Sequence, residues 1–508
     1  MAISNPGGNL NSVGAPLKQT LSTNYIDFTD SNTSGWAQQY LPDLMEGEAE
    51  VFGNRTISGF LAQVGAEEAM ASDQVIWSEQ GRLHLAYNAT VADVNNITGA
   101  ADGSGGGILT IGNDLDGNTA GSNPAIRPND TILIAQSTGI VRAIVESVSG
   151  ATVDVLPYGY ASLTAAGITA AACKVLVYGS EFAKGTDGRD EAAQPQFETF
   201  TNKPIILKDY YEISGSDVSQ VGWVEVTGED GQNGYYWYLK AEGDVRSRFS
   251  DYCEMAMLES VKPIAGSLID NTAIGTDTIP GGVTPNYVNG TAATMTGTNF
   301  GTEGLFAAIE DRGNVTTGIN GINAATDLAE FDAILAEFDN QGAIEENMMF
   351  VNRTVSLAID DMLASMNSYG AGGSSYGVFN NSEDMALNLG FSGFRRGSYD
   401  FYKSDFRYLN DKATRKTIND EYAAGAIRGV IIPAGVSSVY DQSLGRNLKR
   451  PFLHVRYRAS QMEDRKMKSW ITGSVGGNVT SALDAMQVQF LSERCLVVQG
   501  ANIFMLLK

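Results

Sequence analysis

The stretch NGYYWYLKAEGDVRSRFSDYCEMAMLESV, residues 233–261, decides the fold of this chain, because it predicts one long and uninterrupted α-helix. At 1.5 Å per residue such a helix would be about 43 Å long, and Pro263 gives it a defined end. Gly243 is its one weak point. Its apolar side chains recur at the three-and-four spacing of one helical face, at Tyr238, Ala241, Val245, Phe249, Tyr252 and Ala256. The chain is β-rich before this stretch and alternates helices with strands after it, so we expect a rigid rod between two differently built halves.

Length and composition set broad limits. The 508 residues suffice for two to four domains, at about 150 residues per domain. The N-terminus MAISNPGGNLNSVG is polar and no run of about 18 apolar residues exists, so we expect a soluble chain with no export signal and no membrane partner. Cys173, Cys253 and Cys495 lie far apart without a CxxC pair, which predicts buried thiols in a protein folded in a reducing cytoplasm.

Charge is unevenly distributed. The net charge of −25 argues against a general nucleic-acid binder. Residues 393–468 nevertheless hold 16 Lys/Arg against 8 Asp/Glu, whereas the remaining chain holds 18 against 51. This basic block is either a solvated face or a surface that meets acidic patches on neighbouring copies of the same protein. On the second interpretation its candidate subunit contacts are Arg395, Arg396, Arg446, Lys449 and Arg450.

The region before the long helix divides into three parts. Residues 1–72 are polar and weakly periodic, which predicts an arm ordered by the surface on which it lies. Residues 73–190 carry short β-type runs separated by Gly, Asn and Asp clusters, which predicts an inserted barrel or sandwich. The glycine-rich run 101–112 lacks the GK[ST] ending of a phosphate loop, so we interpret it as a flexible loop.

The third part is an apolar segment, residues 195–217. Two extended runs flank the turn-type triplet Asn202-Lys203-Pro204, which predicts a β-hairpin. A hairpin this apolar lies either on its own domain or across a neighbouring subunit. Its candidate subunit contacts are Phe197, Phe200, Ile205, Leu207, Tyr210 and Tyr211.

An α/β unit follows the long helix. Residues 326–342 predict a helix with a capping box from Asp327 to Glu330 and a terminating Gly342. The inward face of that helix would hold Leu328, Phe331, Leu335 and Phe338. Met348–Val351 predicts a strand, and Asn352 would cap a second helix running through Met366 with Val355, Ile359 and Met362 inward. Further strands are expected at 430–433 and 452–457, with a closing pair at 486–490 and 494–499.

The sequence carries no recognisable catalytic or metal-binding pattern. His84 and His454 are the only histidines, and neither lies near a nucleophile motif. The segment Asn113–Asn118 comes nearest to a calcium loop but lacks the glutamate that closes an EF-hand. We therefore expect no catalytic residue, no cofactor and no metal ion.

The order of these parts resembles that of a tailed-bacteriophage major capsid protein of the Hong Kong 97 type. The resemblance lies in the segment FETFTNKPIILKDYYEISGS, the long charged helix, the unit LAEFDAILAEFDNQGAIEENMMFVNRTVSLAIDDM, and the ending EDRKMKSWITGSVGG…ALDAMQVQFLSERCLVVQGANIFMLL. It covers roughly residues 197–508 well, and the first 190 residues by position only. The family has no invariant short motif, so its signal is the order of the parts. The insertion at 73–190 departs from the simplest members.

The resemblance implies an α+β fold and a division of the chain. The expected parts are an N-terminal arm (1–72), a β-rich insertion domain (73–190), an extended-loop hairpin (191–222), a peripheral domain with the spine helix 233–261 (223–325), an axial domain (326–450) and a return to the peripheral domain (451–508). It also implies a non-enzymatic subunit that is assembled in the host bacterial cytoplasm as hexamers and pentamers into an icosahedral virion shell. Implied partners are further copies of itself, portal, scaffold and auxiliary or decoration proteins, and double-stranded DNA at the inner face without sequence specificity.

Two other functions remain open from the residues alone. One is a carboxylate-based glycoside hydrolase with an appended β-rich domain, since paired acidic residues are compatible with that chemistry. The other is a different phage structural subunit, such as a tail tube or sheath protein. The capsid subunit is the favoured interpretation, because the chain lacks the aromatic and His-rich loop clusters that sugar sites use and the order of its parts resembles the capsid family.

Overall fold

The structure is a computed structural model of the 508-residue chain. It describes residues 60–61, 66–82, 84–99, 105–115, 117, 124–189, 197–216, 226–227, 233–234, 236–263, 301–316, 324–367, 393–422, 425–434, 436–441, 446–475 and 479–508. The chain forms two compact units. The main unit comprises Met1–Val75 and Thr201–Lys508, and the barrel unit comprises Ile76–Phe200.

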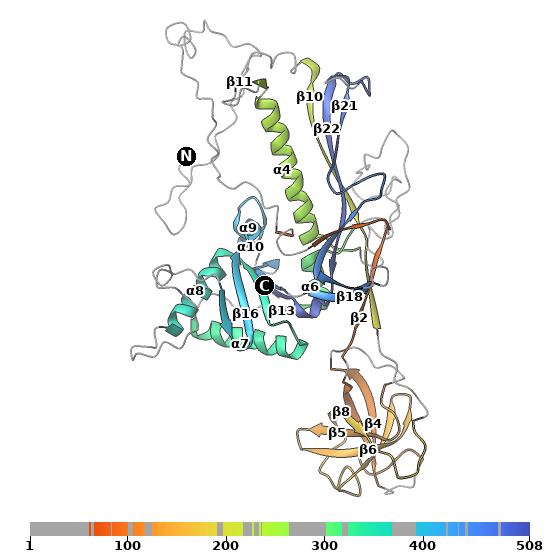
Figure 1. Cartoon of the computed structure of the whole chain (residues 1–508). Coiled ribbons are helices and arrows are strands. Elements are labelled where there is room, and N and C mark those ends of the chain that lie inside the picture. The colour runs from red at the N-terminus through yellow and green to blue at the C-terminus, as the bar shows by residue number, and fades with distance from the viewer. Residues whose placement is uncertain are drawn as a thin grey trace, which may run out of the picture. The chain divides into compact units, whose positions relative to one another are not determined.

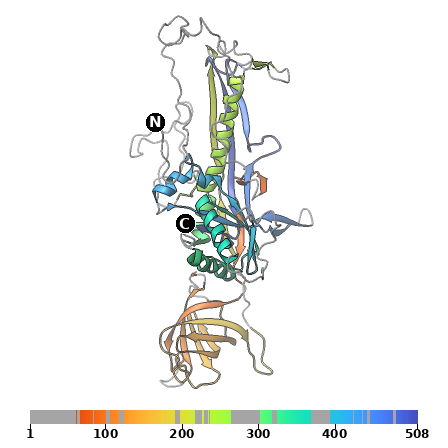
Figure 2. The same ribbon diagram turned by 90° about the vertical axis from the view of Figure 1, so that its left-hand side faces the viewer.

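A long helix on a long sheet dominates the main unit. The sheet has the order β1 (Ala66–Met70), β20 (Leu453–Arg458), β22 (Ala485–Val498) and β10 (Ile205–Ser214), and β21 (Lys468–Gly473) also pairs with β22. Helix α4 (Tyr236–Glu259) runs alongside β10 and β22 in both views (Figure 1, Figure 2). The rings of Phe249 and Phe490 stack between helix and strand with their centroids 6.0 Å apart. The predicted rod is therefore confirmed as one 24-residue helix that stays unbroken at Gly243.

The ends and the inward face of α4 differ from the prediction. The helix begins at Tyr236 because Asn233–Gly234 forms strand β12, which pairs with β11 (Val226–Thr227). Its buried residues include Phe249, Cys253, Met257 and Leu258, whereas Tyr252 is 46% exposed. The expected stripe was wrong at Tyr252 because the buried positions follow a spacing of four along this part of the helix, which turns Tyr252 toward solvent.

The predicted hairpin at 195–217 is wrong. Strand β9 (Phe197–Asn202) pairs with β2 (Val75–Gln80), and β10 pairs antiparallel with β22 from Ile205↔Arg494 to Ser214↔Ala485. The two extended runs exist, but each has a partner distant in sequence. The triplet Asn202-Lys203-Pro204 is consequently the point at which the chain changes partners.

The closing pair of strands is also wrong, because residues 485–498 form a single strand. The polar residues Ser492, Glu493 and Arg494 suggest a turn in the sequence, yet all three are buried within β22. Arg494 Nε donates to Ser492 Oγ over 2.8 Å, and Glu493 Oε2 lies 2.5 Å from Arg465 Nε. Partners inside the fold satisfy these polar groups, so the strand does not need to turn.

A second sheet in the main unit carries the expected α/β unit. Its order is β13 (Asn314–Thr316), β23 (Met505–Leu507), β17 (Gly429–Pro433), β14 (Glu346–Val351), β16 (Tyr399–Asp405) and β15 (Gly393–Arg396). Helices α7 (Ala324–Gln341) and α8 (Arg353–Asn367) pack on it through a core that includes Phe331, Phe338, Ile359 and Phe401. The Asn352 cap is confirmed, since its Oδ1 accepts the Val355 N–H over 2.9 Å.

Other expectations for this unit are only partly met. The capping box at Asp327 is wrong, because α7 already begins at Ala324. Leu335 is partly buried and Ile334 is buried, while the side chains of Leu328 and Met362 lie outside the described residues. Shorter elements complete the main unit: α6 (Leu305–Arg312), α9 (Arg407–Asn410), α10 (Arg415–Glu421), η4 (Ala501–Ile503) and the hairpin of β18 (Val436–Asp441) and β19 (Arg446–Pro451).

The barrel unit resolves the choice between a barrel and a sandwich. Six strands close in the order β3 (Ala86–Asp93), β4 (Gly107–Asp114), β7 (Thr152–Pro157), β6 (Gly139–Ser149), β5 (Asp130–Gln136) and β8 (Ala172–Ser180). Its interior is filled by branched aliphatic side chains, among them Leu109, Ile132, Ile134, Val153 and Val155. Alternation along each strand therefore sends every second residue to the outside of the barrel.

Gly243 lies within α4 and Gly304 lies against its C-terminal end, and substitution by alanine should change the unfolding free energy in opposite directions at the two positions. A Cβ at Gly243 would meet nothing within 4 Å, so Gly243→Ala removes the entropic penalty of a mid-helix glycine and should stabilise the chain by about 0.5–1 kcal/mol. A Cβ at Gly304 would lie 2.8 Å from the Ser260 carbonyl oxygen and 2.9 Å from that of Leu258, so Gly304→Ala should destabilise it by about 1–3 kcal/mol. Urea unfolding of both variants checks the pair, and equal shifts would contradict the helix placement.

Candidate functional site

The face of β10, β22 and β21 that points away from α4 forms an amphipathic surface, which we call the outer sheet face. Along β10 the side chains alternate, with Leu207 packing against the cluster of Phe249 and Phe490 while Ile206 and Tyr210 point the other way. Ile206 is 52% exposed and Tyr210 is 54% exposed. Alternation in β10 thus turns one set of side chains toward the chain's own core and the other set toward the outside of the sheet.

Register extends this face across three strands. Tyr210 lies opposite Gln489, which lies opposite Trp470, so the three side chains form one row. Lys468 Nζ lies 5.5 Å from the centroid of the Trp470 ring. Exposed Tyr and Trp surrounded by polar and charged side chains are typical of protein–protein contact surfaces.

The polar residues of the outer sheet face bind one another. Gln487 Nε2 donates to Glu212 Oε2 over 2.6 Å, and Gln487 Oε1 accepts from Gln489 Nε2 over 3.1 Å. These hydrogen bonds hold the glutamine amides in place, so the rings of Tyr210 and Trp470 supply the apolar contact area of the surface. The arrangement can bind another protein surface, and it brings together no acid, base and nucleophile.

The predicted contact residues do not all share this face. Tyr210 lies on the outer sheet face, whereas Ile205 and Leu207 pack toward the chain's own core. The Phe200 ring lies 6.2 Å from that of Trp77 in the β2–β9 pair. The side chain of Phe197 lies outside the described residues. The contact role of these residues, including the half-buried Tyr211, stays a prediction.

Sequence reasoning missed Ile206 and Trp470. It treated 195–217 as a hairpin and counted apolar residues along both runs. Had β10 been interpreted as one long half-buried strand, strict alternation would have placed Ile206 with Tyr210 and separated both from Leu207. No local signal identified Trp470, because its place in the row depends on the pairing of β21 with β22.

The basic block is largely paired within the chain where it is described. Lys403 forms a buried ion pair with Asp360, and Arg415 reaches Glu259 at the end of α4. Arg396 binds Asp332 through two nitrogen atoms, with Nη2 and Oδ2 2.7 Å apart. Further pairs join Arg456 to Glu68, Arg465 to Glu493 and Lys468 to Glu463.

Besides a solvated face or a subunit contact, the basic block thus has a third role that the sequence did not suggest, which is to form ion pairs between segments of the same chain. Arg395 is exposed and lies 3.7 Å from Asp400. The side chains of Arg446, Lys449 and Arg450 on β19 lie outside the described residues. The contact role of these four residues and of Arg396 therefore remains a prediction.

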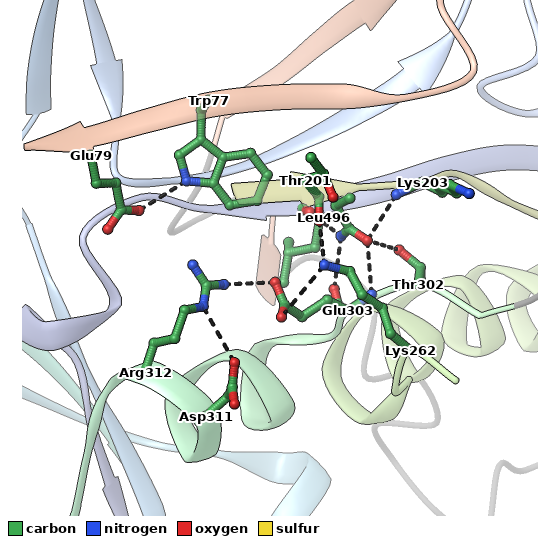
Figure 3. Close-up of polar contacts among 11 residues, drawn as sticks. Trp77, Glu79, Thr201, Lys203, Lys262, Thr302, Glu303, Asp311, Arg312 and Leu496 are labelled. Carbon is green, nitrogen blue, oxygen red and sulfur yellow. Dashed lines mark hydrogen bonds and ion pairs between the residues drawn. The ribbon is translucent and has the colours of Figure 1, made fainter. Parts of the chain in front are cut away.

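A buried asparagine holds the junction between β9 and β10 (Figure 3). Asn202 Nδ2 donates to the carbonyl oxygens of Leu496 and Glu303 over 2.6 and 3.0 Å. Its Oδ1 accepts the N–H groups of Lys203 and Glu303, each over 2.9 Å, and the Thr302 hydroxyl over 3.1 Å. This one amide therefore ties the start of β10 to β22 and to the segment that leads into α6.

An ion network lies beside that junction (Figure 3). Arg312 Nη2 lies 2.6 Å from Glu303 Oε2, and Lys262 Nζ lies 3.8 Å from Glu303 Oε1 while also donating to the Thr201 carbonyl. Two cations therefore share one largely buried carboxylate. We interpret the cluster as a structural clamp, since Glu303 joins Arg312 of α6 to Lys262, which lies just after α4.

Asn202→Asp tests the junction that Asn202 holds between β9 and β10. The new carboxylate would face two carbonyl acceptors, so the variant should lose on the order of 3 kcal/mol of unfolding free energy. Asn95→Asp changes an exposed asparagine in the same way and should shift stability by no more than about 0.5 kcal/mol. Urea unfolding at neutral pH measures both, and equal small shifts would show that Asn202 is not a buried hub.

The described residues contain no group of three or more His, Cys, Asp or Glu side chains that could hold a metal ion. His454 is buried in β20 with Nδ1 3.3 Å from the Pro451 carbonyl oxygen, so its predicted strand position is confirmed. His84 is exposed just before β3. Among the described helices, none has the length and apolarity that crossing a bilayer requires.

The three cysteines are free and buried, as predicted. Burial raises the pKa of the Cys173 thiol to about 11 and that of Cys495 to about 12, and it also raises the pKa of Cys253. A raised pKa lowers the thiolate fraction at neutral pH, and the thiolate is the reactive form.

Thiol reactivity should therefore follow unfolding. With a disulfide reagent at pH 8, the folded chain should react at least about a hundredfold more slowly than the chain in concentrated urea, because little thiolate is present and access is blocked. The reagent's absorbance measures this directly. Rapid reaction of even one thiol in the folded chain would contradict its burial.

Comparison with known proteins gives similarities in structure only. No protein-family model matches the chain, and no curated protein matches it. Similar solved structures include "Capsid of native GTA particle computed with C5 symmetry", at 11% identity and TM-score 0.37, covering 95% of this chain and 99% of that one. Another is "Asymmetric unit of bacteriophage PhiM1 mature capsid", at 8% identity and TM-score 0.36, covering 92% of each chain.

A third is "Capsid structure of the Cyanophage P-SCSP1u", at 9% identity and TM-score 0.36, covering 96% of this chain and 98% of that one. The solved structures to which the chain is similar thus include phage capsids, the class that its sequence resembles. At these identities and TM-scores the similarity assigns no function to the chain.

Proposed function

We propose that this chain is a shell-forming structural subunit, a major capsid protein of the Hong Kong 97 type, and not an enzyme. The observation that carries the proposal is the outer sheet face. A 24-residue helix covers one side of a long sheet, and the other side presents Ile206, Tyr210 and Trp470. Such a rigid two-layer beam with an amphipathic outer face suits repeated contacts with identical neighbours.

The parts of the chain support specific roles within that proposal. Helix α4 would be the spine of a peripheral domain, and the second sheet with α7 and α8 would be the axial domain at the centre of each hexamer or pentamer. The β2–β9 pair, in place of the hairpin expected at 195–217, would be the base of the extended loop. The barrel would then be an insertion at that loop, and residues 1–72 would be the N-terminal arm.

Self-assembly explains why such a chain needs no active site. Heterologous contacts around a rotation axis close into rings, and many identical copies together bury more surface than one copy can alone. The proposed shell is assembled in the host cytoplasm and becomes part of the virion. Its further partners would be a portal, scaffold and auxiliary proteins. The acidic balance of the chain, −25 in total, suits an inner wall that does not grip the packaged double-stranded DNA.

The outer sheet face gives the direct test. Ile206→Asp combined with Tyr210→Asp places two charges on exposed positions, so the subunit should stay folded while the concentration needed for assembly rises at least about tenfold. Met462→Asp with Val479→Asp is the matched control, because these exposed apolar residues lie in loops and not on β10, β21 or β22.

Negative-stain images and light scattering measure the outcome. Closed shells from the unchanged chain and the control, with few or none from the double variant, are the expected result. Tubes would favour a tail subunit, and monodisperse monomers of the unchanged chain under all conditions would defeat the capsid proposal. Normal shells from the Ile206/Tyr210 variant would show that this face is not a subunit contact.

A further inference from the structure

Four adjacent strands of the barrel, β7, β6, β5 and β8, expose an apolar surface on the outside of the barrel. Inward residues such as Val141, Ala143 and Val145 fill the core, so alternation turns Ile140, Arg142 and Ile144 of β6 outward. The register places Leu156 opposite Ile144, and Leu133 opposite both Arg142 and Leu176. These outward residues therefore form one continuous surface across four strands.

Two tyrosines extend this surface. The Tyr158 N–H donates to the Arg142 carbonyl oxygen over 3.1 Å, which places Tyr158 next to β6. In the pairing of β5 with β8, Thr131 lies opposite Gly179 and Ile132 lies opposite Val177. Tyr178 is therefore the extra residue of β8 at this register shift, and its side chain points outward. Leu156 is 37% exposed and Tyr178 is 51% exposed. We name the whole set the barrel face: Leu133, Ile140, Ile144, Leu156, Tyr158, Leu176 and Tyr178.

An apolar outer surface is unusual for a barrel whose core is already filled by its own inward side chains. A solvated sheet face ordinarily alternates apolar-in with polar-out, and folded proteins rarely expose contiguous apolar patches larger than a few hundred Å² unless something binds there. Tyrosine adds contact area at a low entropic penalty, which suits a binding surface. The composition of the barrel face therefore indicates a protein partner.

The charges on the barrel face specify that partner. Arg142 and Lys174 are exposed on its strands, and neither forms an ion pair with another described residue. Glu146 and Glu181 lie at its margin, and Glu181 accepts the Tyr158 hydroxyl. Residues 76–200 as a whole carry 6 Lys/Arg against 13 Asp/Glu. Two cations thus stand among apolar side chains in a unit that is otherwise acidic, which is complementary to an acidic partner surface.

We propose that the barrel face docks on an acidic surface of a second copy of this chain. The chain supplies such surfaces in abundance, with 59 Asp/Glu against 34 Lys/Arg. This inference rests on the proposed self-assembly and adds a contact to it. The barrel is then an assembly element that joins neighbouring subunits, with the leucines and tyrosines buried between copies and Arg142 and Lys174 opposite carboxylates.

Isotope-mixed cross-linking tests the contact. The full chain is prepared unlabelled and with ¹⁵N, mixed before assembly, and treated with a carbodiimide, which couples an amine only to a carboxylate in direct contact. Lys174 should give cross-linked peptides that join a labelled to an unlabelled chain. Lys184, an exposed lysine of the same unit outside the barrel face, is the control and should give at least about fivefold fewer.

A variant gives the second arm. Leu156→Glu with Leu176→Glu changes exposed positions, so the fold should persist while the concentration required for assembly rises at least about tenfold. Leu115→Glu, at another exposed leucine of the barrel unit, should leave assembly unchanged.

The outcomes separate this contact from the wider proposal. Lys174 links confined to single chains would show that the barrel face lies on its own subunit, and absence of any Lys174 link would show that no acidic protein surface covers it. Either result overturns the docking even if shells form normally. If the unchanged chain forms no shells, the capsid proposal fails, and the same cross-linking on the species in solution still decides whether copies meet through the barrel face.

Discussion

The packing of α4 against β22 is the constraint on which the main unit depends. Phe249 and Cys253 of the helix meet Val488 and Phe490 of the strand in one buried cluster. Strand β22 pairs with β10 on one side and with β21 and β20 on the other. This central strand of 14 residues carries the helix on one face, and on the opposite face its first residues lie in a row with the exposed Tyr210 and Trp470.

Buried polar groups decide which strands pair with which. Ser492, Glu493 and Arg494 would favour a turn if they were solvated, and Asn202 would favour one as well. In the folded chain Arg465 and the Lys466 carbonyl satisfy the first group, while Asn202 makes its bonds to Leu496, Glu303, Lys203 and Thr302. Because an unsatisfied buried polar group costs about 1–3 kcal/mol, these bonds disfavour alternative strand registers.

The two units each present a sheet face that their own core does not use. The outer sheet face has aromatic rings within a network of glutamine and glutamate, and the barrel face has leucine and tyrosine around two cations. In the proposed shell both would be covered by other copies of the chain. The two faces are built from different strands and carry different side chains, so they would contact different surfaces of the neighbours.

The sequence by itself determined the elements whose signal is local. Periodicity, capping and composition predict the long α4, the helix α8 with its Asn352 cap, the short strands that form the barrel and the burial of the cysteines. Only the tertiary structure decided what pairs with what. Strands β9 and β10 each pair with a strand more than a hundred residues away in sequence. Strand β22 continues through three polar residues without a turn. Trp470 of β21 lies in one row with Tyr210 of β10 because both strands pair with β22. The physical reason is that hydrogen bonds, ion pairs and burial supplied by distant segments outweigh the weak local turn preferences of Asn, Ser and Pro. The local sequence around each strand does not indicate which distant segment will supply them.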